Sequence, residues 1–245
     1  MLTKKIIKPI KNNTRKEEKK FKYLDIITTL FVTILLVSNI VAVKIVKIGI
    51  FLVPGATLLF PISYIFGDIL TEVYGYGRSR KVIWLGIICN LLMAIIFIII
   101  GALPSAPIWH NQNAYETILG LTPRIVVASI LGYFTGEFTN SFTMARMKII
   151  TEGKYLWTRT IGSTLIGEFF DTLLFIMIAF TGVIPSSVLL SLIIAQYILK
   201  VTIEILFTPI TYRVVSFLKR TENEDYYDRD TNFNPFILHA NKNIL

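Results

Sequence analysis

Polar side chains recur at helical spacing inside stretches of this sequence that are otherwise apolar. A spacing of three or four residues places the polar groups of each stretch on one face of a helix. Carboxyl, amide and amine groups in such a setting can bind a polar ligand, and they seldom stay buried without a partner or a wet cavity. The candidate substrate-binding residues are Asp68, Glu72, Glu137, Asn140, Glu168, Asp171, Gln196, Lys200 and Glu204.

Glu168 and Asp171 stand near the middle of the apolar segment Thr158–Thr181. A helix that starts at Thr158 rises 1.5 Å per residue, which places Glu168 about 15 Å along it, near the bilayer midplane. Thr160 and Thr164 extend the same face toward the start of the helix. We expect this face to line a substrate site.

A purely structural role, in which the buried charges only pair with one another, is the alternative reading of these residues. Lys200 could pair with Asp171 on the preceding span or with Glu204 one turn along its own helix. The acids outnumber this lysine, so some acid must be protonated, hydrated or held for a ligand. The acids counted are Asp68, Glu137, Glu168, Asp171 and Glu204.

The composition is typical of a membrane protein. Of the 245 residues, 53% are hydrophobic and only 17% are charged. The formal net charge of +9 is concentrated in residues 1–23, where nine Lys or Arg residues stand against Glu17 and Glu18. We expect a flexible cytoplasmic arm beside anionic lipid, and no direct binding of nucleic acid, because no aromatic platform accompanies the basic residues.

Six apolar stretches are long enough to cross a bilayer, which predicts an all-α integral membrane protein of six transmembrane helices. The first stretch lacks a small-residue cleavage site and is too long for a signal peptide, so we expect it to remain. Small residues four apart, Gly132 with Gly136 and Ser163 with Gly167, predict close packing of the fourth and fifth helices. The predicted spans are Leu24–Val43, Thr57–Tyr74, Lys81–Leu103, Arg124–Met147, Thr158–Thr181 and Ser186–Val215.

The basic residues between the spans predict the orientation. Lys and Arg residues follow the second and sixth spans and flank the link between the fourth and fifth, whereas the loops at 104–123 and 182–185 contain neither. By the positive-inside rule we expect both termini in the cytoplasm and a multi-pass protein of the cell inner membrane. Lys44, Lys47 and Arg124 are exceptions whose side chains can reach the interface.

The segments outside the helices receive predictions of their own. In residues 44–56, β-branched residues with Gly49 and Pro54 suggest a short extended hairpin on the outer side. Residues 24–218 form the transmembrane domain. In residues 219–245 apolar residues become rare and acidic residues gather, which predicts a polar, disordered cytoplasmic tail.

Catalytic and metal chemistry find little support in the sequence. The two histidines lie in a loop and in the tail, and the one cysteine stands alone, so we expect no metal site, disulfide or cofactor. Gly67-Asp68 together with Asp171 resembles the paired aspartates of intramembrane aspartyl proteases, but Ile65 stands where those enzymes carry a glycine. We do not expect an enzyme, and an intramembrane protease is the weaker alternative.

Four stretches of the second to sixth spans carry a resemblance to a known family. They are Phe60–Gly77, Gly136–Ser141, Arg159–Thr172 and Gln196–Lys200. In these stretches the chain resembles the queuosine precursor transporter family, once called vitamin-uptake transporters. The resemblance implies a six-helix inner-membrane importer of 7-cyano-7-deazaguanine or 7-aminomethyl-7-deazaguanine, and it places Asp68, Asp171 and Lys200 at polar positions of the family.

The chemistry of the candidate residues is compatible with a guanine-like substrate. The guanine edge presents two adjacent N–H donors that match the two oxygens of one carboxylate, and Lys200 or Gln196 can donate to its O6 acceptor. Aromatic side chains can stack on the ring. A substrate-binding membrane subunit that needs a separate energising module is the main alternative, and a homo-oligomer stays open as well. The sequence has no phosphate-binding loop for direct use of ATP.

Overall fold

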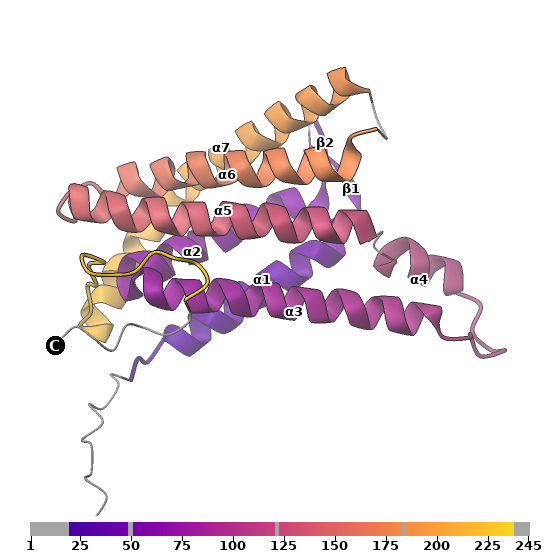
Figure 1. Cartoon of the computed structure of the whole chain (residues 1–245), viewed down its shortest axis with the longest axis horizontal. Coiled ribbons are helices and arrows are strands. Elements are labelled where there is room, and N and C mark those ends of the chain that lie inside the picture. Colours follow the sequence, from indigo (N-terminus) through magenta and orange to yellow (C-terminus); the bar gives the residue numbers. More distant parts are fainter. Residues whose placement is uncertain (1–19, 49–50, 121–122, 183–184, 238–245) are drawn as a thin grey trace, which may run out of the picture.

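The computed structural model describes residues 20–48, 51–120, 123–182 and 185–237, and it is built mainly of helices (Figure 1). Six helical segments of this part of the chain are long and apolar enough to cross a membrane, as predicted. The chain is therefore an all-α membrane protein. The helices are α1 (Leu24–Val41), α2 (Phe60–Tyr74), α3 (Tyr76–Ala102), α4 (Gln112–Leu119), α5 (Pro123–Ile150), α6 (Leu156–Phe180) and α7 (Ser186–Glu222).

Three shorter elements stand between the first two helices. Strands β1 (Ile45–Ile48) and β2 (Phe51–Pro54) pair antiparallel, and the 3-10 helix η1 (Gly55–Leu58) leads into α2. The strands fall in the segment where the sequence suggests a hairpin. The predicted basic arm lies outside the described residues except for its last part, 20–23.

Helix α4 was not predicted, because the prolines of the 104–123 segment favour a loop. Two hydrogen bonds fasten it to the end of α3. The Gln112 side chain donates to the Gly101 carbonyl at 3.0 Å, and the Tyr115 hydroxyl donates to the Phe97 carbonyl at 3.1 Å. Eight residues are too few for an isolated helix to be stable in water, so these contacts stabilise it.

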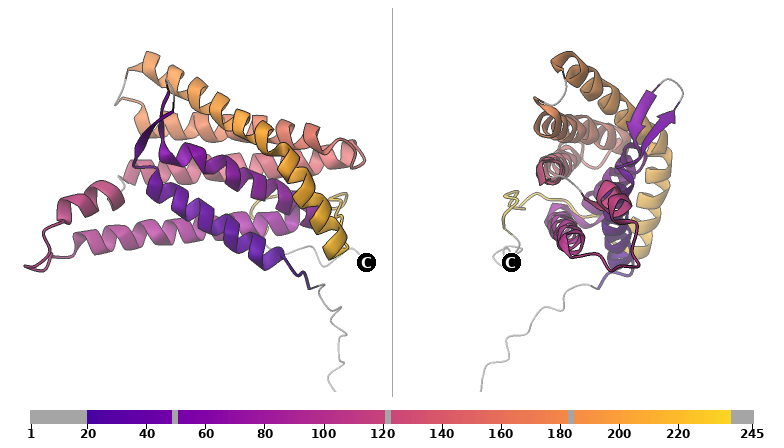
Figure 2. Two further views of the ribbon diagram at one scale, coloured as in Figure 1. Left: turned by 180° about the vertical axis from the view of Figure 1, so that it is seen from behind. Right: turned by 90° about the vertical axis from the view of Figure 1, so that its right-hand side faces the viewer.

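Helix α2 occupies the middle of the bundle. It packs against α1, α3, α5 and α7, and most of its residues are buried. Its 15 residues rise only about 22 Å, less than the apolar thickness of a bilayer, and η1 lengthens the span at one end. Figure 1 shows α5 in front of α2, and the reverse view in Figure 2 brings α1 and α7, on the other side of α2, to the front. The acids of α2 are therefore surrounded by protein rather than by lipid.

Helices α5 and α6 make the most extensive contact in the bundle, and glycines allow their close approach. A Cβ atom added at Gly167 would lie 2.8 Å from the Asn140 Cβ and 2.9 Å from the Gly136 carbonyl oxygen. A Cβ atom at Gly136 would clash with the Tyr64 hydroxyl. The predicted close packing of these two helices is confirmed.

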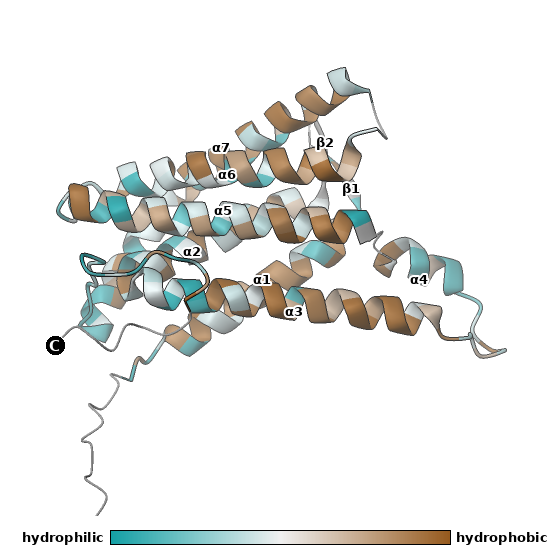
Figure 3. Ribbon diagram, viewed as in Figure 1, coloured by the Kyte–Doolittle hydropathy of each residue, from teal (hydrophilic) through white to brown (hydrophobic). Residues whose placement is uncertain are grey.

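Apolar and polar residues are separated along the bundle. Figure 3 shows hydrophobic residues along α3 and hydrophilic residues gathered at the end of the bundle where the tail lies. Large apolar side chains such as Ile88, Ile99 and Leu206 are exposed on the outer faces of α3 and α7. In a membrane these apolar faces meet lipid, and the polar end of the bundle meets water.

The expected disorder of the C-terminal tail does not hold for residues 223–237, which lie against the polar ends of the helices. Arg80 donates to the carbonyls of Asn232 and Asn234 at 2.8 and 2.7 Å, and Trp84 donates to the Pro235 carbonyl at 2.8 Å. Asp228 accepts the backbone N–H of Tyr76 at 2.9 Å. The acidic composition of the tail predicts a solvated, disordered segment. The donors that bind the tail lie at the start of α3, far away in the sequence, so the composition of the tail contains no sign of these contacts.

The close approach of α5 and α6 yields a test. Gly167→Ala forces a methyl group against the backbone and side chain of α5, and such overpacking costs about 1–3 kcal/mol. We expect a lower thermal transition temperature in detergent. Gly77→Ala is the control, because its Cβ would meet no atom within 4 Å. Equal transition temperatures for the two variants would contradict this account of the packing.

Candidate functional site

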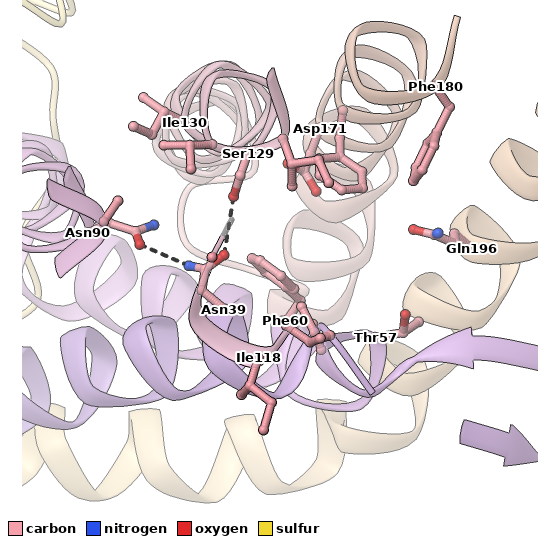
Figure 4. Close-up of a pocket in the computed structure, with 18 of the residues that line it drawn as sticks. Asn39, Thr57, Phe60, Asn90, Ile118, Ser129, Ile130, Asp171, Phe180 and Gln196 are labelled. Carbon is pink, nitrogen blue, oxygen red and sulfur yellow. Dashed lines mark hydrogen bonds between the residues drawn. The ribbon is translucent and has the colours of Figure 1, made fainter. Parts of the chain in front are cut away.

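A cavity of about 350 Å³ lies at the hairpin end of the bundle, a volume that holds a small heterocycle. Its walls come from α1, α2, α3, α5, α6 and α7, with α4 at its edge. Figure 4 shows its polar and aromatic side chains. The polar lining consists of Asn39, Thr57, Asn90, Thr117, Ser129, Asp171, Gln196 and Lys200, and the aromatic lining of Phe60, Phe175 and Phe180.

One wall carries three hydrogen-bonded polar side chains from three helices. The Asn39 amide donates to the Asn90 side-chain oxygen at 3.1 Å, and the Ser129 hydroxyl donates to the Asn39 side-chain oxygen at 3.2 Å (Figure 4). Sequence reasoning missed all three residues. The signal that could have found two of them was an asparagine in each of two strongly apolar spans, Asn39 in the first and Asn90 in the third. A buried amide is costly in a membrane unless it is hydrogen-bonded, so such residues indicate a partner or a ligand.

Across the cavity, Lys200 of α7 forms two ion pairs with α6. Its Nζ lies 2.7 Å from a carboxylate oxygen of Glu168 and 2.6 Å from one of Asp171. The Phe60 ring centroid lies 5.3 Å from the same Nζ. We call Glu168, Asp171 and Lys200 the Lys200 triad. Asp171 and Lys200 line the cavity, whereas Glu168 is fully buried beside them.

The triad decides between the two pairings that the sequence left open. Lys200 pairs with Asp171, and with Glu168 in addition. No ion pair joins Lys200 to Glu204 in the part of the chain that the structure describes, and neither carboxyl oxygen of Glu204 has a hydrogen-bond partner there. Because Lys200 is engaged with two carboxylates, the amide of Gln196 is the better placed donor for a ligand (Figure 4).

Four further candidate residues gather beyond the triad, away from the cavity. We call Asp68, Glu137, Asn140 and Glu204 the inner acidic cluster, and all four are completely buried. The Asn140 amide donates to Asp68 at 2.8 Å. The Glu137 carboxyl lies against the bare Cα of Gly67, where a Cβ atom would stand 2.8 Å from its oxygen. None of the four lines the cavity.

Glu72 stands apart from both groups. Arg159 donates to its two oxygens, each at 2.7 Å, and the ammonium groups of Lys219 and Lys148 lie 2.5 and 3.5 Å from it. Asp225 of the tail accepts from Lys148 and Lys219 at 2.6 and 2.8 Å. We call these five residues the Glu72 network. It joins α2, α5, α6, α7 and the tail, which indicates a structural role for Glu72 in place of the predicted ligand contact.

The sequence analysis did not predict this network, because it assigned Lys148, Arg159 and Lys219 to the cytoplasmic ends and loops of the spans. Arg159 and Lys148 are instead helical and almost fully buried, at 1% and 2% exposure. Both oxygens of Glu72 accept from Arg159, and Oε1 also accepts from Lys219, so this carboxylate is engaged with cations at both oxygens.

Two acids of the tail respond differently to their surroundings. Burial alone would raise the pKa of Asp225, but hydrogen bonds from Lys148 and Lys219 outweigh it and lower the pKa below its ordinary value. Burial raises the pKa of Asp228, and the hydrogen bonds that it accepts from Tyr76 and Thr231 only partly oppose this. Asp225 therefore adds stability above its unfolded-state pKa, which is lost as pH falls through its lower, folded-state pKa.

These groups form an ordered polar series through the bundle. Gln196, Lys200 and Glu204 follow one another on successive turns of α7, and Lys219 comes four turns later. The series runs from the cavity through the Lys200 triad and the inner acidic cluster to the Glu72 network. Eight of the nine candidates lie in the cavity wall, the Lys200 triad or the inner acidic cluster, and three of these eight line the cavity. The ninth, Glu72, is buried at the far end of the series.

The Glu72 network can be tested by removing its central charge. Glu72→Gln leaves the buried Arg159 and Lys148 and the partly buried Lys219 facing a neutral amide, and breaking a buried ion pair costs about 3–5 kcal/mol. We expect a much lower thermal transition temperature in detergent. Glu152→Gln is the control, because Glu152 is 76% exposed and its ion pair is 3.9 Å long. Similar transition temperatures would show that the network does not stabilise the fold.

Comparison with known proteins identifies the family. A family model described as "Putative vitamin uptake transporter" matches residues 54–214. The "Probable queuosine precursor transporter" of Bacillus subtilis (strain 168) is 28% identical over 188 residues, which cover 76% of this chain and 81% of that protein. The "Queuosine precursor transporter" of Escherichia coli (strain K12) is 25% identical over 159 residues, which cover 64% and 69%. No solved structure matches the chain. The matched region spans the second to sixth membrane helices, and the chain belongs to the vitamin uptake transporter family.

Proposed function

We propose that the protein imports a deazaguanine precursor of queuosine, 7-cyano-7-deazaguanine or 7-aminomethyl-7-deazaguanine, across the cell inner membrane. Two relatives are named as queuosine precursor transporters, and the family is one of transporters. The observation that carries the proposal is the cavity in which Asp171 and Gln196 stand beside the rings of Phe60 and Phe175.

The recognition follows from hydrogen-bond chemistry. The guanine edge donates N1–H and N2–H to the Asp171 carboxylate, whose oxygen bound to Lys200 still has a second lone pair. Gln196 donates to O6, since Lys200 is engaged with Glu168 and Asp171. Phe60 packs on the face of the ring. A neutral flat base needs these paired contacts to leave water.

Asn39, Asn90 and Ser129 are proposed to contact the substituent at position 7. They form the wall opposite Asp171 and Gln196 (Figure 4). A base whose guanine edge binds Asp171 directs its five-membered ring across the cavity toward this wall. The two asparagines carry both donors and acceptors, which suit either a nitrile or an aminomethyl group.

The proposed orientation places the cavity toward the outside and the Glu72 network toward the cytoplasm. Support comes from the positive-inside rule, because the basic links and both ends of the helical domain lie at the Glu72 end. In this orientation the base enters from outside, and the Glu72 network closes the cytoplasmic end.

Cysteine labelling tests this orientation. Ser105→Cys and Glu152→Cys place thiols at exposed positions near opposite ends of the bundle, in a Cys89→Ala background that removes the native thiol. We expect an impermeant maleimide applied to intact cells to label position 105 but not 152, and to label both after permeabilisation. Labelling of 152 alone in intact cells would reverse the orientation.

Ligand binding tests the role of Asp171. We expect purified protein to bind both deazaguanines and to bind guanine more weakly. Lys200→Met should lose stability and affinity, because it leaves the buried carboxylates of Glu168 and Asp171 without their cation, at a cost of about 3–5 kcal/mol. Asp171→Asn should lose affinity but less stability, because Lys200 keeps its ion pair with Glu168. The double variant should regain part of the stability that Lys200→Met loses, because only Glu168 then lacks its cation, but it should not regain affinity. Asp25→Asn on the exposed start of α1 is the control.

Two outcomes would contradict parts of the proposal. Recovery of affinity together with stability in the double variant would remove Asp171 from the ligand site and leave it as half of a structural pair. Binding without uptake, when the purified protein alone is placed in liposomes, would favour a binding subunit that needs a separate energising module.

A further inference from the structure

The inner acidic cluster contains three carboxyl groups that no described cation contacts. Lys200 pairs with Glu168 and Asp171, and Arg159, Lys148 and Lys219 gather on Glu72. Asp68, Glu137 and Glu204 remain, and each is completely buried. A carboxylate that is buried without a counter-charge is so costly that the group normally becomes neutral by taking up a proton.

The unpaired hydrogen-bonding groups around the cluster also favour protonated carboxyl groups. Six buried acceptor oxygens of its acids and amide, and a seventh on the neighbouring Glu168, have no hydrogen-bond donor in the described part of the chain, and only three buried hydroxyl groups there are without partners. A proton on a carboxyl group converts one orphaned acceptor into a donor, so protonation satisfies two groups at once. The acceptors are Asp68 Oδ2, both oxygens of Glu137 and of Glu204, Asn140 Oδ1 and Glu168 Oε1, and the hydroxyls are those of Tyr64, Tyr133 and Thr164.

We propose that Glu137 and Glu204, together with Asp68, form a proton-binding site that couples proton movement to transport. Each carboxylate accepts one proton from a hydronium ion, which leaves a water molecule, and becomes a neutral acid; release of the proton to water restores the carboxylate. The proton site itself rests on burial and charge in the inner acidic cluster. Only its coupling to substrate rests on the proposed function.

Lys200 is the physical link between this site and the cavity. Glu204 stands one turn from Lys200 on the same face of α7, and Glu168 presents one oxygen to Lys200 while the other has no described partner. When Glu204 loses its proton, a new carboxylate competes with Asp171 for the Lys200 ammonium. Because Asp171 lines the cavity, the affinity of the cavity for a base changes with the charge of the cluster. By linkage, binding of a base must change the proton affinity of the cluster by the same factor.

A proton fits the cluster better than a metal ion. No group of three or more histidine, cysteine, aspartate or glutamate residues among the described ones is arranged to hold a metal. One monovalent cation would neutralise one of three carboxylates, whereas protons can neutralise each separately. The titratable and charged groups that face the cluster are Tyr64 and Glu72 on α2, Tyr133 on α5, Arg159, Glu168 and Asp171 on α6, and Lys200 on α7.

Infrared spectroscopy of the full chain in lipid tests the proton site without any ligand. A protonated carboxyl group has a C=O stretching band that a carboxylate lacks. We expect such a band at neutral pH, reduced in Glu137→Gln and in Glu204→Gln, and unchanged in the surface control Glu152→Gln. A spectrum in which neither substitution alters the band, in protein with an unchanged thermal transition, would overturn the proposal.

Uptake into proteoliposomes tests the coupling. We expect an inside-alkaline pH gradient to drive accumulation of 7-cyano-7-deazaguanine by the unmodified protein, and Glu204→Gln to abolish that dependence on the gradient. Accumulation driven by a sodium gradient at equal pH would overturn the proton coupling. If the carboxyl band is assigned to these residues but neither deazaguanine binds, the proton site is supported and the proposed function is the part that fails.

Discussion

The ion pairs of Lys200 with Glu168 and Asp171 are the interaction on which the interior of this protein depends. They bring a charged residue of α7 against the polar face of α6 and leave Asp171 at the edge of the cavity. In a membrane an unpaired charge at this depth costs several kcal/mol, so neither partner can be removed alone without loss. Glycines at the α5–α6 contact let the two helices approach closely enough to enclose these charges.

The two ends of the polar interior differ in a way that suits transport. At the hairpin end, aromatic rings and amides surround a cavity of about 350 Å³. At the other end, Arg159, Lys148, Lys219 and Asp225 close around Glu72, and residues of the tail pack over the ends of α2 and α3. Such a bundle is accessible from one side and sealed by charge on the other, and opening the sealed side requires several ion pairs to separate together.

The sequence predicted the helices and most of the interior because both follow from local patterns. Membrane-length apolar stretches identified six spans, and i, i+3 or i, i+4 spacing identified eight polar residues that share one interior. It could not distinguish Glu72 from the others, since its three cations come from α5, α6 and α7, far away in the sequence. For the same reason it missed the wall of Asn39, Asn90 and Ser129, which forms only when α1, α3 and α5 pack together.

The central claim is that the cavity beside the Lys200 triad binds a guanine-like base. An experimental density map of the protein in lipid with 7-cyano-7-deazaguanine bound tests it most directly. We expect the base in the cavity, with its guanine edge within hydrogen-bond distance of Asp171, its O6 near Gln196 and its ring face on Phe60. Density for the base elsewhere, with Asp171 in contact only with Lys200, would contradict the account.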